Sequence, residues 1–499
     1  MRGRWCRAAV VAGVLTMATA TAMAMAMTGL ERGPERAGRP VGALTWTDCG
    51  GGFECATLRV PLAHRRPGEQ VGIAVIRLPA SGGAGERIGS LVVNPGGPGA
   101  SGVEYARAAR VVLGAEVRKR FDVVGFDPRG VGRSAPVECL SDAELDAFVA
   151  LDGTPDTAGE RLALEEGARR FAEGCRRRSG RLLPHLGTVD VARDLDRLRQ
   201  ALGERRLTYL GKSYGTLLGA VYASLFPGRV RAMVLDGALD PGGSRVRLGV
   251  EQAAGFERAL RAYAEDCLAA GGCPFRSRTV GGAVQEVSGL LRRADERPLR
   301  GDGRRRVTQA VAVLGLLGPL YDRALWPELT ETLRRAFQGD GALLLRNADQ
   351  LTGRHDDGTY SNETEANMAV NCADGPHPRQ PATYGRNAAA ARERAPRFGP
   401  YLVWSSLPCA YWPHPPALGP VTAKGAAPIL VIGTERDPAT PYAWARRLAG
   451  ELGSGVLLRY RGDGHTAYSS GSRCVDEVVE GYLVAGVAPE DGAVCPGIG

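Results

Sequence analysis

The chain has few of the residues that metal sites and nucleic-acid surfaces need. Its six histidines are scattered and no two cysteines are separated by two residues, which argues against a structural zinc site. Only three of its 63 basic residues are lysines, and the 63 are mixed with 54 acidic residues. The formal charge of +9 therefore indicates solvated arginines rather than a nucleic-acid-binding surface. We expect no nucleic-acid partner.

Long apolar runs are missing too, except near the N-terminus. Residues 1–27 combine three early arginines with an apolar run and small-residue cleavage sites, which is typical of a secretory signal peptide. A retained membrane anchor is the alternative, but threonines interrupt the run and no charged anchor follows it directly. Residues 28–40 have the composition of a linker or short pro-segment. We expect a secreted protein with no membrane span after signal removal.

Cysteine is present in an even number once Cys6 is removed with the signal peptide. The ten that remain, in a chain that we expect to be exported, predict five disulfides. Sequence does not prove their connectivity, but pairing in sequence order closes five local loops. These pairs are Cys49 with Cys55, Cys139 with Cys175, Cys267 with Cys273, Cys372 with Cys409, and Cys474 with Cys495.

Short apolar runs alternate with helical patterns over much of the chain. Valine pairs at residues 92–93 and 123–124 indicate strands that are buried on both faces. This alternation predicts an α/β fold with a mostly parallel central sheet, whose active-site loops follow the carboxyl ends of the strands. Strands are expected at residues 71–78, 90–94 and 122–127, and from about residues 207, 230, 428 and 456.

The alternation stops near residue 240 and resumes near residue 426. We expect residues 241–425 to form a mainly helical cap, inserted into a core made of residues 41–240 and 426–499. A smaller helical insert at residues 139–178 is expected to join the same roof. Helices in the cap are predicted at residues 248–267, 307–321, 326–337 and 342–351.

Residues 207–219 contain the most informative motif. Ser213 lies between Gly211 and Gly215, where a predicted strand meets a predicted helix, as in a nucleophile elbow. The sharp turn that exposes the serine hydroxyl requires residues without bulk on both sides. The chain has 69 glycines, so the alternative is a serine in a glycine-rich surface turn. The order of strand, turn and helix favours the elbow.

A serine nucleophile needs an imidazole to take its proton and a carboxylate to orient that imidazole. Asp437 follows a late predicted strand and His465 follows the last one, in the order that this arrangement requires. Glu435 and Asp463 are the second and third choices for the acid. We expect Thr440 to hydrogen-bond within the acid's loop. The alternative is that the aspartate only starts a turn and the histidine is an ordinary loop residue.

Acyl transfer also needs N–H donors for the oxyanion that develops on the substrate. One is expected from the amide of Tyr214, directly after the serine, and the other from Gly97, in the loop at residues 94–102. A turn rich in glycine and proline is common after a strand. The run Pro-Gly-Gly-Pro-Gly after a buried strand is much less common.

Five motifs occur in order from about residue 90 onwards: NPGGPGASG, FDPRGVGRS, GKSYGT, ERDPATP and GDGH. With the C-terminal cysteine segment, they resemble the secreted tripeptidyl aminopeptidases of the prolyl aminopeptidase family. The resemblance implies an α/β-hydrolase fold with a helical cap, release of short peptides from a free N-terminus, and no cofactor or metal. Prolyl aminopeptidases usually have histidine before Gly-Gly-Pro-Gly. Asn94 and Pro95 stand here, as in the tripeptidyl branch.

An enzyme that binds a free α-amine needs a carboxylate in the cap, because a buried ammonium without a partner is costly. The candidates are Glu363, Glu365 and Asp374, although they fit equally well as ordinary surface acids or charges at a helix N-terminus. A secreted carboxylesterase with the same triad is the main alternative function. A non-catalytic binding protein on the same fold is a third. We expect a monomer that binds peptides with a free N-terminus.

Overall fold

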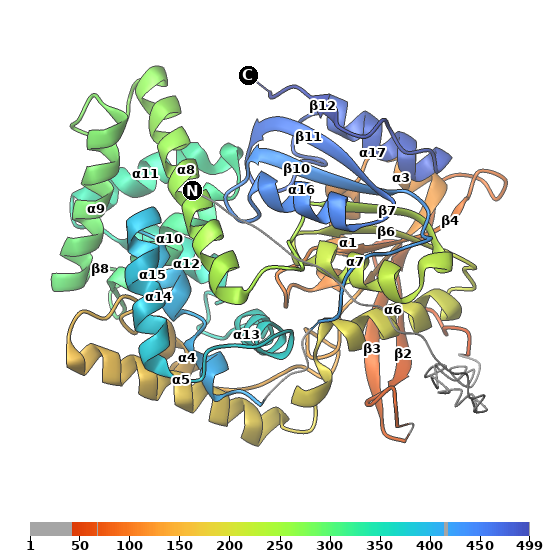
Figure 1. Ribbon diagram of the computed structural model, residues 1–499, viewed down its shortest axis with the longest axis horizontal. Helices are drawn as coiled ribbons and strands as arrows, with labels where there is room; N and C mark the ends of the chain where they lie inside the picture. The colour runs from red at the N-terminus through yellow and green to blue at the C-terminus, as the bar shows by residue number, and fades with distance from the viewer. Residues whose placement is uncertain (1–41, 67, 414–417, 499) are drawn as a thin grey trace, which may run out of the picture. The chain divides into compact units, whose positions relative to one another are not determined.

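The computed structural model describes residues 42–66, 68–413 and 418–498 (Figure 1), so the expected signal peptide and pro-segment lie outside the described residues. Ten of the described strands form one sheet in the order β1-β2-β3-β5-β4-β6-β7-β10-β11-β12. Their bounds are Thr47–Asp48 (β1), Glu54–Pro61 (β2), Gln70–Leu78 (β3), Gly89–Asn94 (β4), Phe121–Phe126 (β5), Leu207–Lys212 (β6), Val230–Asp236 (β7), Ile429–Arg436 (β10), Gly455–Asp463 (β11) and Ala493–Cys495 (β12).

The sheet is mostly parallel, which confirms the predicted fold class. Strands β5, β4, β6, β7, β10, β11 and β12 pair in parallel, and β1, β2 and β3 add an antiparallel edge. Parallel pairing brings the carboxyl ends of β4, β6, β10 and β11 to the same edge of the sheet. The loops that carry Gly97, Ser213, Asp437 and His465 follow these four ends.

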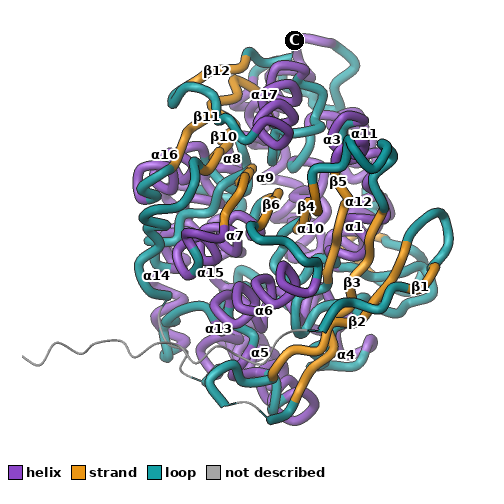
Figure 2. The backbone as a smooth tube through the Cα atoms, turned by 90° about the vertical axis from the view of Figure 1, so that its right-hand side faces the viewer, coloured by secondary structure: helices purple, strands orange, loops and turns teal. Residues whose placement is uncertain are grey.

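Helices cover both faces of the sheet, which explains why its central strands are apolar throughout (Figure 2). Strands β4 and β5 are buried along their whole length. Val92 packs in one cluster with residues of α6 and α7, and Val93 packs in another with residues of α1 and α17. The helices on the two faces are Gly102–Arg107 (α1), Ala109–Val112 (α2), Ala115–Arg120 (α3), Thr188–Ala201 (α6), Tyr214–Leu225 (α7), Tyr442–Glu451 (α16) and Arg473–Ala485 (α17).

A mainly helical segment joins β7 to β10 and has a hydrophobic cluster of its own, with members such as Phe256, Leu290 and Leu316. We call this segment, with the helices α4 and α5, the roof; Figure 1 shows most of it on the left. It also contains a two-stranded sheet, Leu299–Arg300 (β8) and Arg306–Val307 (β9). Its helices are Arg245–Ala270 (α8), Val280–Glu296 (α9), Gln309–Leu320 (α10), Trp326–Phe337 (α11), Ala342–Thr352 (α12), Glu363–Ala373 (α13), Pro381–Arg394 (α14) and Gly399–Trp404 (α15).

Two helices between β5 and β6 complete the roof: α4 (Asp142–Val149) and α5 (Ala158–Ser179). Each begins with a capping box, in which Ser141 pairs with Glu144 and Thr157 pairs with Glu160. The buried side of α5 packs in one cluster with residues of α14 and α15. The small insert is therefore continuous with the larger helical segment.

All ten cysteines of the described residues form disulfides, and they pair in sequence order as expected. The pairs are Cys49–Cys55, Cys139–Cys175, Cys267–Cys273, Cys372–Cys409 and Cys474–Cys495.

The sequence pattern located the parallel strands but missed other elements. Strand β2 was not expected, because it lies at the antiparallel edge, where only Leu58 and Val60 are buried and the other side chains are half-buried or exposed. Helices α9, α13 and α14 were not expected either, whereas α11 has the predicted bounds. In the described part of the chain, we find no helix with both the length and the hydropathy of a membrane span.

Candidate active site

Ser213 lies in a sharp turn between β6 and α7. Its backbone has φ 54° and ψ −125°, a conformation that is strained for any residue with a side chain. A Cβ on Gly211 would lie 2.4 Å from the carbonyl oxygen of Gly215, and a Cβ on Gly215 would lie 2.7 Å from Oδ1 of Asn94. Both positions therefore require glycine. The turn has the geometry of a nucleophile elbow.

The loop after β4 runs directly against this turn. A Cβ on Gly96 would lie 2.5 Å from the carbonyl oxygen of Lys212 and 2.9 Å from the amide nitrogen of Tyr214. The Gly96 amide donates to Oδ1 of Asn94 at 3.0 Å. Among the described residues, the amides of Gly97 and Tyr214 have no hydrogen-bond acceptor. These two amides are therefore free to bind an oxyanion.

A second loop, after β5, supports the loop after β4. Oδ1 of Asp127 accepts hydrogen bonds from Ser101 Oγ (2.5 Å) and from the Val103 amide (3.1 Å). Its Oδ2 accepts from the Arg133 amide at 2.9 Å. Asp127 therefore ties the start of α1, which follows the loop of Gly97, to the turn of the FDPRGVGRS motif.

Asp437 and His465 form a hydrogen-bonded pair. Nδ1 of His465 lies 3.0 Å from each carboxylate oxygen of Asp437. Oδ1 of Asp437 also accepts from the amides of Ala439 (2.9 Å) and Thr440 (2.8 Å), and Oδ2 accepts from Thr440 Oγ1 (3.0 Å), as expected for the acid's loop. Because both oxygens have other donors, the carboxylate is held in one orientation. Its bond to Nδ1 leaves Nε2 available for a proton.

The two rival carboxylates have other partners. Glu435 forms an ion pair with Arg459, and Asp463 accepts two hydrogen bonds from Arg436 at 2.5 Å. Neither carboxylate has a hydrogen bond with His465 in the described structure. As for metals, the described residues hold no group of three or more histidine, cysteine or acidic side chains arranged to bind an ion.

His465 also contacts the roof. Its amide donates to the carbonyl of Tyr321 at 2.7 Å, and the two rings meet edge to face with centroids 5.4 Å apart. Burial, with Asp437 and Glu363 nearby, raises the pKa of Tyr321 to about 12, so its hydroxyl is neutral at pH 7. Nε2 of His465 is buried and has no hydrogen-bond partner among the described residues. An unpaired buried nitrogen is rare in a purely structural histidine.

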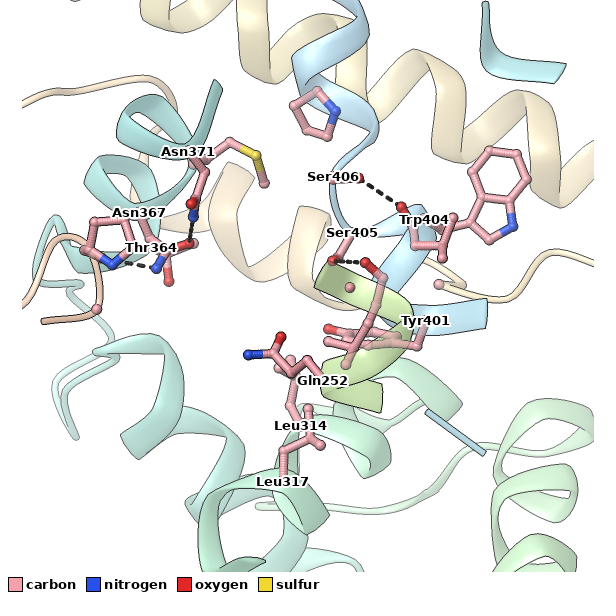
Figure 3. Close-up of a pocket in the computed structure, with 18 of the residues that line it drawn as sticks. Gln252, Leu314, Leu317, Thr364, Asn367, Asn371, Tyr401, Trp404, Ser405 and Ser406 are labelled. Atoms are coloured by element: carbon pink, nitrogen blue, oxygen red, sulfur yellow. Dashed lines mark hydrogen bonds between the residues drawn. The ribbon is translucent and has the colours of Figure 1, made fainter. Parts of the chain in front are cut away.

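Ser213, Tyr214 and His465 line a cavity of about 630 Å³ together with roof residues. Figure 3 shows that its walls differ: one is polar, and the others combine apolar side chains with polar Gln252, Ser405 and Ser406. The polar wall presents Thr364, Asn367 and Asn371 of α13, and the apolar surfaces include Leu314 and Leu317 of α10 and Tyr401 and Trp404 of α15. The cavity can therefore hold a ligand with a polar backbone and apolar side chains.

The structure separates the three carboxylates that the sequence offered as amine ligands. Glu365 accepts hydrogen bonds from the amides of Cys139 (2.6 Å) and Leu140 (2.8 Å), and Asp374 accepts from the amide (2.7 Å) and hydroxyl (2.5 Å) of Thr188. Neither of them lines the cavity of Ser213. Glu363 does, and burial raises its pKa. No hydrogen-bond or ion-pair partner of its carboxylate occurs among the described residues.

Comparison with known proteins agrees with this geometry. A family model described as TAP-like protein matches residues 395–495. Serine protease Hip1 of Mycobacterium tuberculosis is 39% identical over 487 residues, covering 92% of this chain and 91% of that protein. Carboxylesterase B of the same species is 40% identical over 456 residues (88% and 86%), and tripeptidyl aminopeptidase of Streptomyces coelicolor is 35% identical over 465 residues (89% and 84%).

The chain belongs to the tripeptidyl aminopeptidase-like serine hydrolases. The resemblance that the five motifs indicated is confirmed, and so is the prediction of an enzyme with an α/β-hydrolase fold. A purely non-catalytic role on this fold is thereby set aside.

Some residues of this tripeptidyl aminopeptidase-like hydrolase were missed in the sequence. Asn94 and Asp127 hold the loops around the elbow, but the sequence suggested no such role for them. Asn94 ends the buried strand β4 and Asp127 directly follows the buried strand β5, and this position is a signal that could have found them. Tyr321 carries no such signal, because it follows a roof helix, α10, and meets His465 only through the tertiary fold.

Proposed function

We propose that this hydrolase is an exported exopeptidase that releases short peptides, in particular tripeptides, from the free N-terminus of its substrates. Ser213 is the proposed nucleophile, His465 the base and Asp437 the acid that orients it. The proposal depends on one observation above all. Ser213, His465 and the unpartnered carboxylate of Glu363 line the same cavity.

In the proposed reaction, Ser213 Oγ attacks the scissile carbonyl while Nε2 of His465 accepts the hydroxyl proton. The amides of Gly97 and Tyr214 donate to the oxyanion of the tetrahedral intermediate. His465 then gives its proton to the leaving amine, and an acyl-enzyme remains on Ser213. Water, deprotonated by His465, hydrolyses this ester and releases the N-terminal peptide. Asp437 stabilises the imidazolium in both halves of the reaction.

Glu363 is the proposed ligand of the substrate's α-ammonium. Its carboxylate is largely buried in the cavity wall and has no cation beside it, so a substrate ammonium would replace the water that it loses on burial. Glu365 and Asp374 are dropped from this role because each already accepts two hydrogen bonds from the protein. This choice predicts that a blocked N-terminus abolishes binding.

Export and the cap are proposals of the same kind. Five disulfides are expected in a protein that folds in an oxidising compartment, and residues 1–27 have the pattern of a signal peptide. We assign residues 241–425 as the cap, because helices α8, α10, α13 and α15 supply most of the cavity wall opposite Ser213.

Carboxylester hydrolysis is the second candidate. One relative is named carboxylesterase B, and the apolar surface from α10 and α15 would suit an acyl chain. The same triad and oxyanion hole cleave esters, so only recognition of the amine separates the two functions.

The test compares three substrates: alanyl-alanyl-prolyl p-nitroanilide, its N-acetylated form, and a short-chain p-nitrophenyl ester. Glu363→Gln is expected to raise KM for the free-amine peptide on the order of 10- to 100-fold, because it removes the charge that pairs with the ammonium. It should leave ester hydrolysis unchanged. Glu104→Gln is the matched control, since Glu104 lies on α1 outside this cavity. Ser213→Ala should abolish turnover of all three substrates.

Preference for the free-amine peptide that depends on Glu363 supports the exopeptidase. Equal cleavage of the blocked peptide would contradict the role of Glu363. Ester hydrolysis without any peptide release would make the esterase the function of this site.

A further inference from the structure

The segment that follows His465 is attached to the two strands beneath it. Asp236 ends β7, and its carboxylate accepts hydrogen bonds from the amides of Ala467 (3.0 Å to each oxygen) and Tyr468 (2.9 Å). Lys212 ends β6, and its Nζ donates to the carbonyl of Tyr468 at 2.7 Å. These contacts lie two and three residues after His465. Asp236 thus holds the backbone N–H of Tyr468, and Lys212 holds its carbonyl.

The same two strand ends also hold the nucleophile. The carbonyl of Asp236 accepts a hydrogen bond from the Ser213 amide at 2.9 Å. Lys212 directly precedes Ser213 and is the register partner of Asp236 across the parallel pair of β6 and β7. Asp236 and Lys212 thus contact the turn of the serine and the loop of the histidine at once.

The histidine loop needs such support because of its own conformation. Thr466 has φ 70° and Ser469 has φ 60°, values that residues with a side chain rarely adopt. Strained backbone persists only where surrounding contacts hold it. The bonds to Asp236 and Lys212 lie between these two residues, at positions 467 and 468.

Charge also favours a functional role for this pair. Asp236 is 0% exposed, and a buried carboxylate is costly unless it is bonded and paired. Burial raises its pKa, whereas Lys212, the two loop amides and the nearby His465 act in the opposite direction. The carboxylate contacts the loop amides and not Nδ1, so it does not replace Asp437 as the acid.

We propose that Asp236 and Lys212 are positioning residues of the catalytic triad, which join the turn of Ser213 to the loop of His465 and keep Nε2 in reach of the serine hydroxyl. This inference rests on the proposed triad. It does not depend on whether the natural substrate is a peptide or an ester, because both use the same three residues.

The experiment measures kcat and KM of Asp236→Asn and Lys212→Gln with the free-amine p-nitroanilide and the p-nitrophenyl ester. We expect kcat to fall on the order of 100-fold for Asp236→Asn with both substrates, as for a displacement of about 1 Å, while KM stays the same. Lys212→Gln should show a smaller loss of kcat of the same kind. Titration with a serine-directed phosphonate gives the number of competent sites and the rate of labelling. Labelling should be slower in both variants but still reach one per chain.

The matched control is Asp196→Asn. Asp196 is a buried carboxylate on α6 that accepts hydrogen bonds from Arg199 and Arg229 and does not line the cavity of Ser213. The Asp196→Asn variant should have a lower melting temperature and an unchanged kcat per titrated site. If Asp236→Asn does not fold, Lys212→Gln still tests the proposal.

Three outcomes are decisive. A loss of kcat per titrated site at unchanged KM in the folded variants supports positioning. A wild-type kcat in both variants would overturn this inference alone. A wild-type protein that the phosphonate does not label at Ser213 would overturn the proposed triad together with it.

Discussion

The sheet side and the roof side of the cavity differ in how their polar groups are satisfied. On the sheet side, Asp437 and Asp236 accept hydrogen bonds on every carboxylate oxygen from the protein itself. On the roof side, the carboxylate of Glu363 has no partner among the described residues, and burial raises its pKa. The proposed catalytic groups are therefore arranged before a substrate arrives, whereas the proposed recognition group, Glu363, is left for the substrate to complete.

The two sides nevertheless touch at two points. Asn367 of α13 donates to the carbonyl of Pro98, in the loop that carries Gly97, at 2.9 Å. Tyr321 holds the amide of His465 from the end of α10. In the proposed function, the roof therefore supports the catalytic geometry as well as recognition.

The largest effect is expected on the sheet side, from Asp437→Asn. The amide would donate to Nδ1 and fix the wrong tautomer of His465, so kcat should fall about 10⁴-fold while KM changes little. Steady-state kinetics with the free-amine p-nitroanilide measures this. Glu435→Gln is the control, because Glu435 pairs with Arg459, and it should keep wild-type kcat. A large loss in Glu435→Gln with activity retained in Asp437→Asn would reverse the assignment of the acid.

Gly215→Ala should have the next largest effect. Its Cβ would lie 2.7 Å and 2.8 Å from the side-chain and carbonyl oxygens of Asn94, so the elbow and the loop of Gly97 must separate. A displacement of this size is expected to lower kcat on the order of 100-fold. Gly228→Ala meets no atom within 4 Å and serves as the control. Wild-type kcat in Gly215→Ala would show that the close contact is not needed for the reaction.

The parts of this site that the sequence predicted are those set by local geometry. Gly211, Ser213 and Gly215 are recognisable because one turn imposes all three, and Asp437 and His465 are recognisable because each follows a buried strand. The parallel strands themselves were predictable from their apolar runs. The antiparallel β2 was not, because an edge strand with partial burial has a weak pattern.

Contacts between distant segments could not be predicted in this way. Nothing in the residues around Glu363, Glu365 and Asp374 separates them, since the difference arises from what each meets in space: a cavity, the amides after β5, or the start of α6. Asp236 was not singled out for the same reason. Its partners at residues 467 and 468 lie more than 200 positions away in the chain.

A smaller effect, on the roof side, is the pH dependence of substrate binding. Burial raises the pKa of Glu363, so the group becomes neutral as pH falls through that raised value. Only the ionised form pairs with an ammonium, and KM for the free-amine peptide should therefore rise as pH falls, at a pH above the usual range of a glutamate. The measurement is KM between pH 4 and 8. In Glu363→Gln this rise should be missing, and its persistence there would assign it to another group.

The smallest effect concerns Asp295, a roof carboxylate on α9 outside the cavity. Burial, followed by the charges of Asp152, Asp156 and Glu160, raises its pKa to about 6. The folded state therefore binds this proton more tightly than the unfolded chain, and the stability linked to it is present at low pH and lost as pH rises through about 6. Asp295→Asn should raise the melting temperature at pH 7.5 and not at pH 4. Because the side chain is only partly buried and keeps much of its contact with water, solvent screening limits the gain to a few tenths of a kcal/mol.

Glu296→Gln, at the neighbouring exposed carboxylate, removes one of the charges that raise the pKa of Asp295, so its gain in melting temperature at pH 7.5 should be the smaller of the two. Glu363→Gln completes the comparison, because it also removes a roof carboxylate whose pKa burial raises. Asp295→Asn and Glu363→Gln should both stabilise the protein at pH 7.5, but only Glu363→Gln should weaken binding of the free-amine peptide. Equal loss of binding in the two variants would mean that the general negative charge of the roof attracts the substrate. Loss in Glu363→Gln alone would mean that one unsatisfied carboxylate in the cavity does.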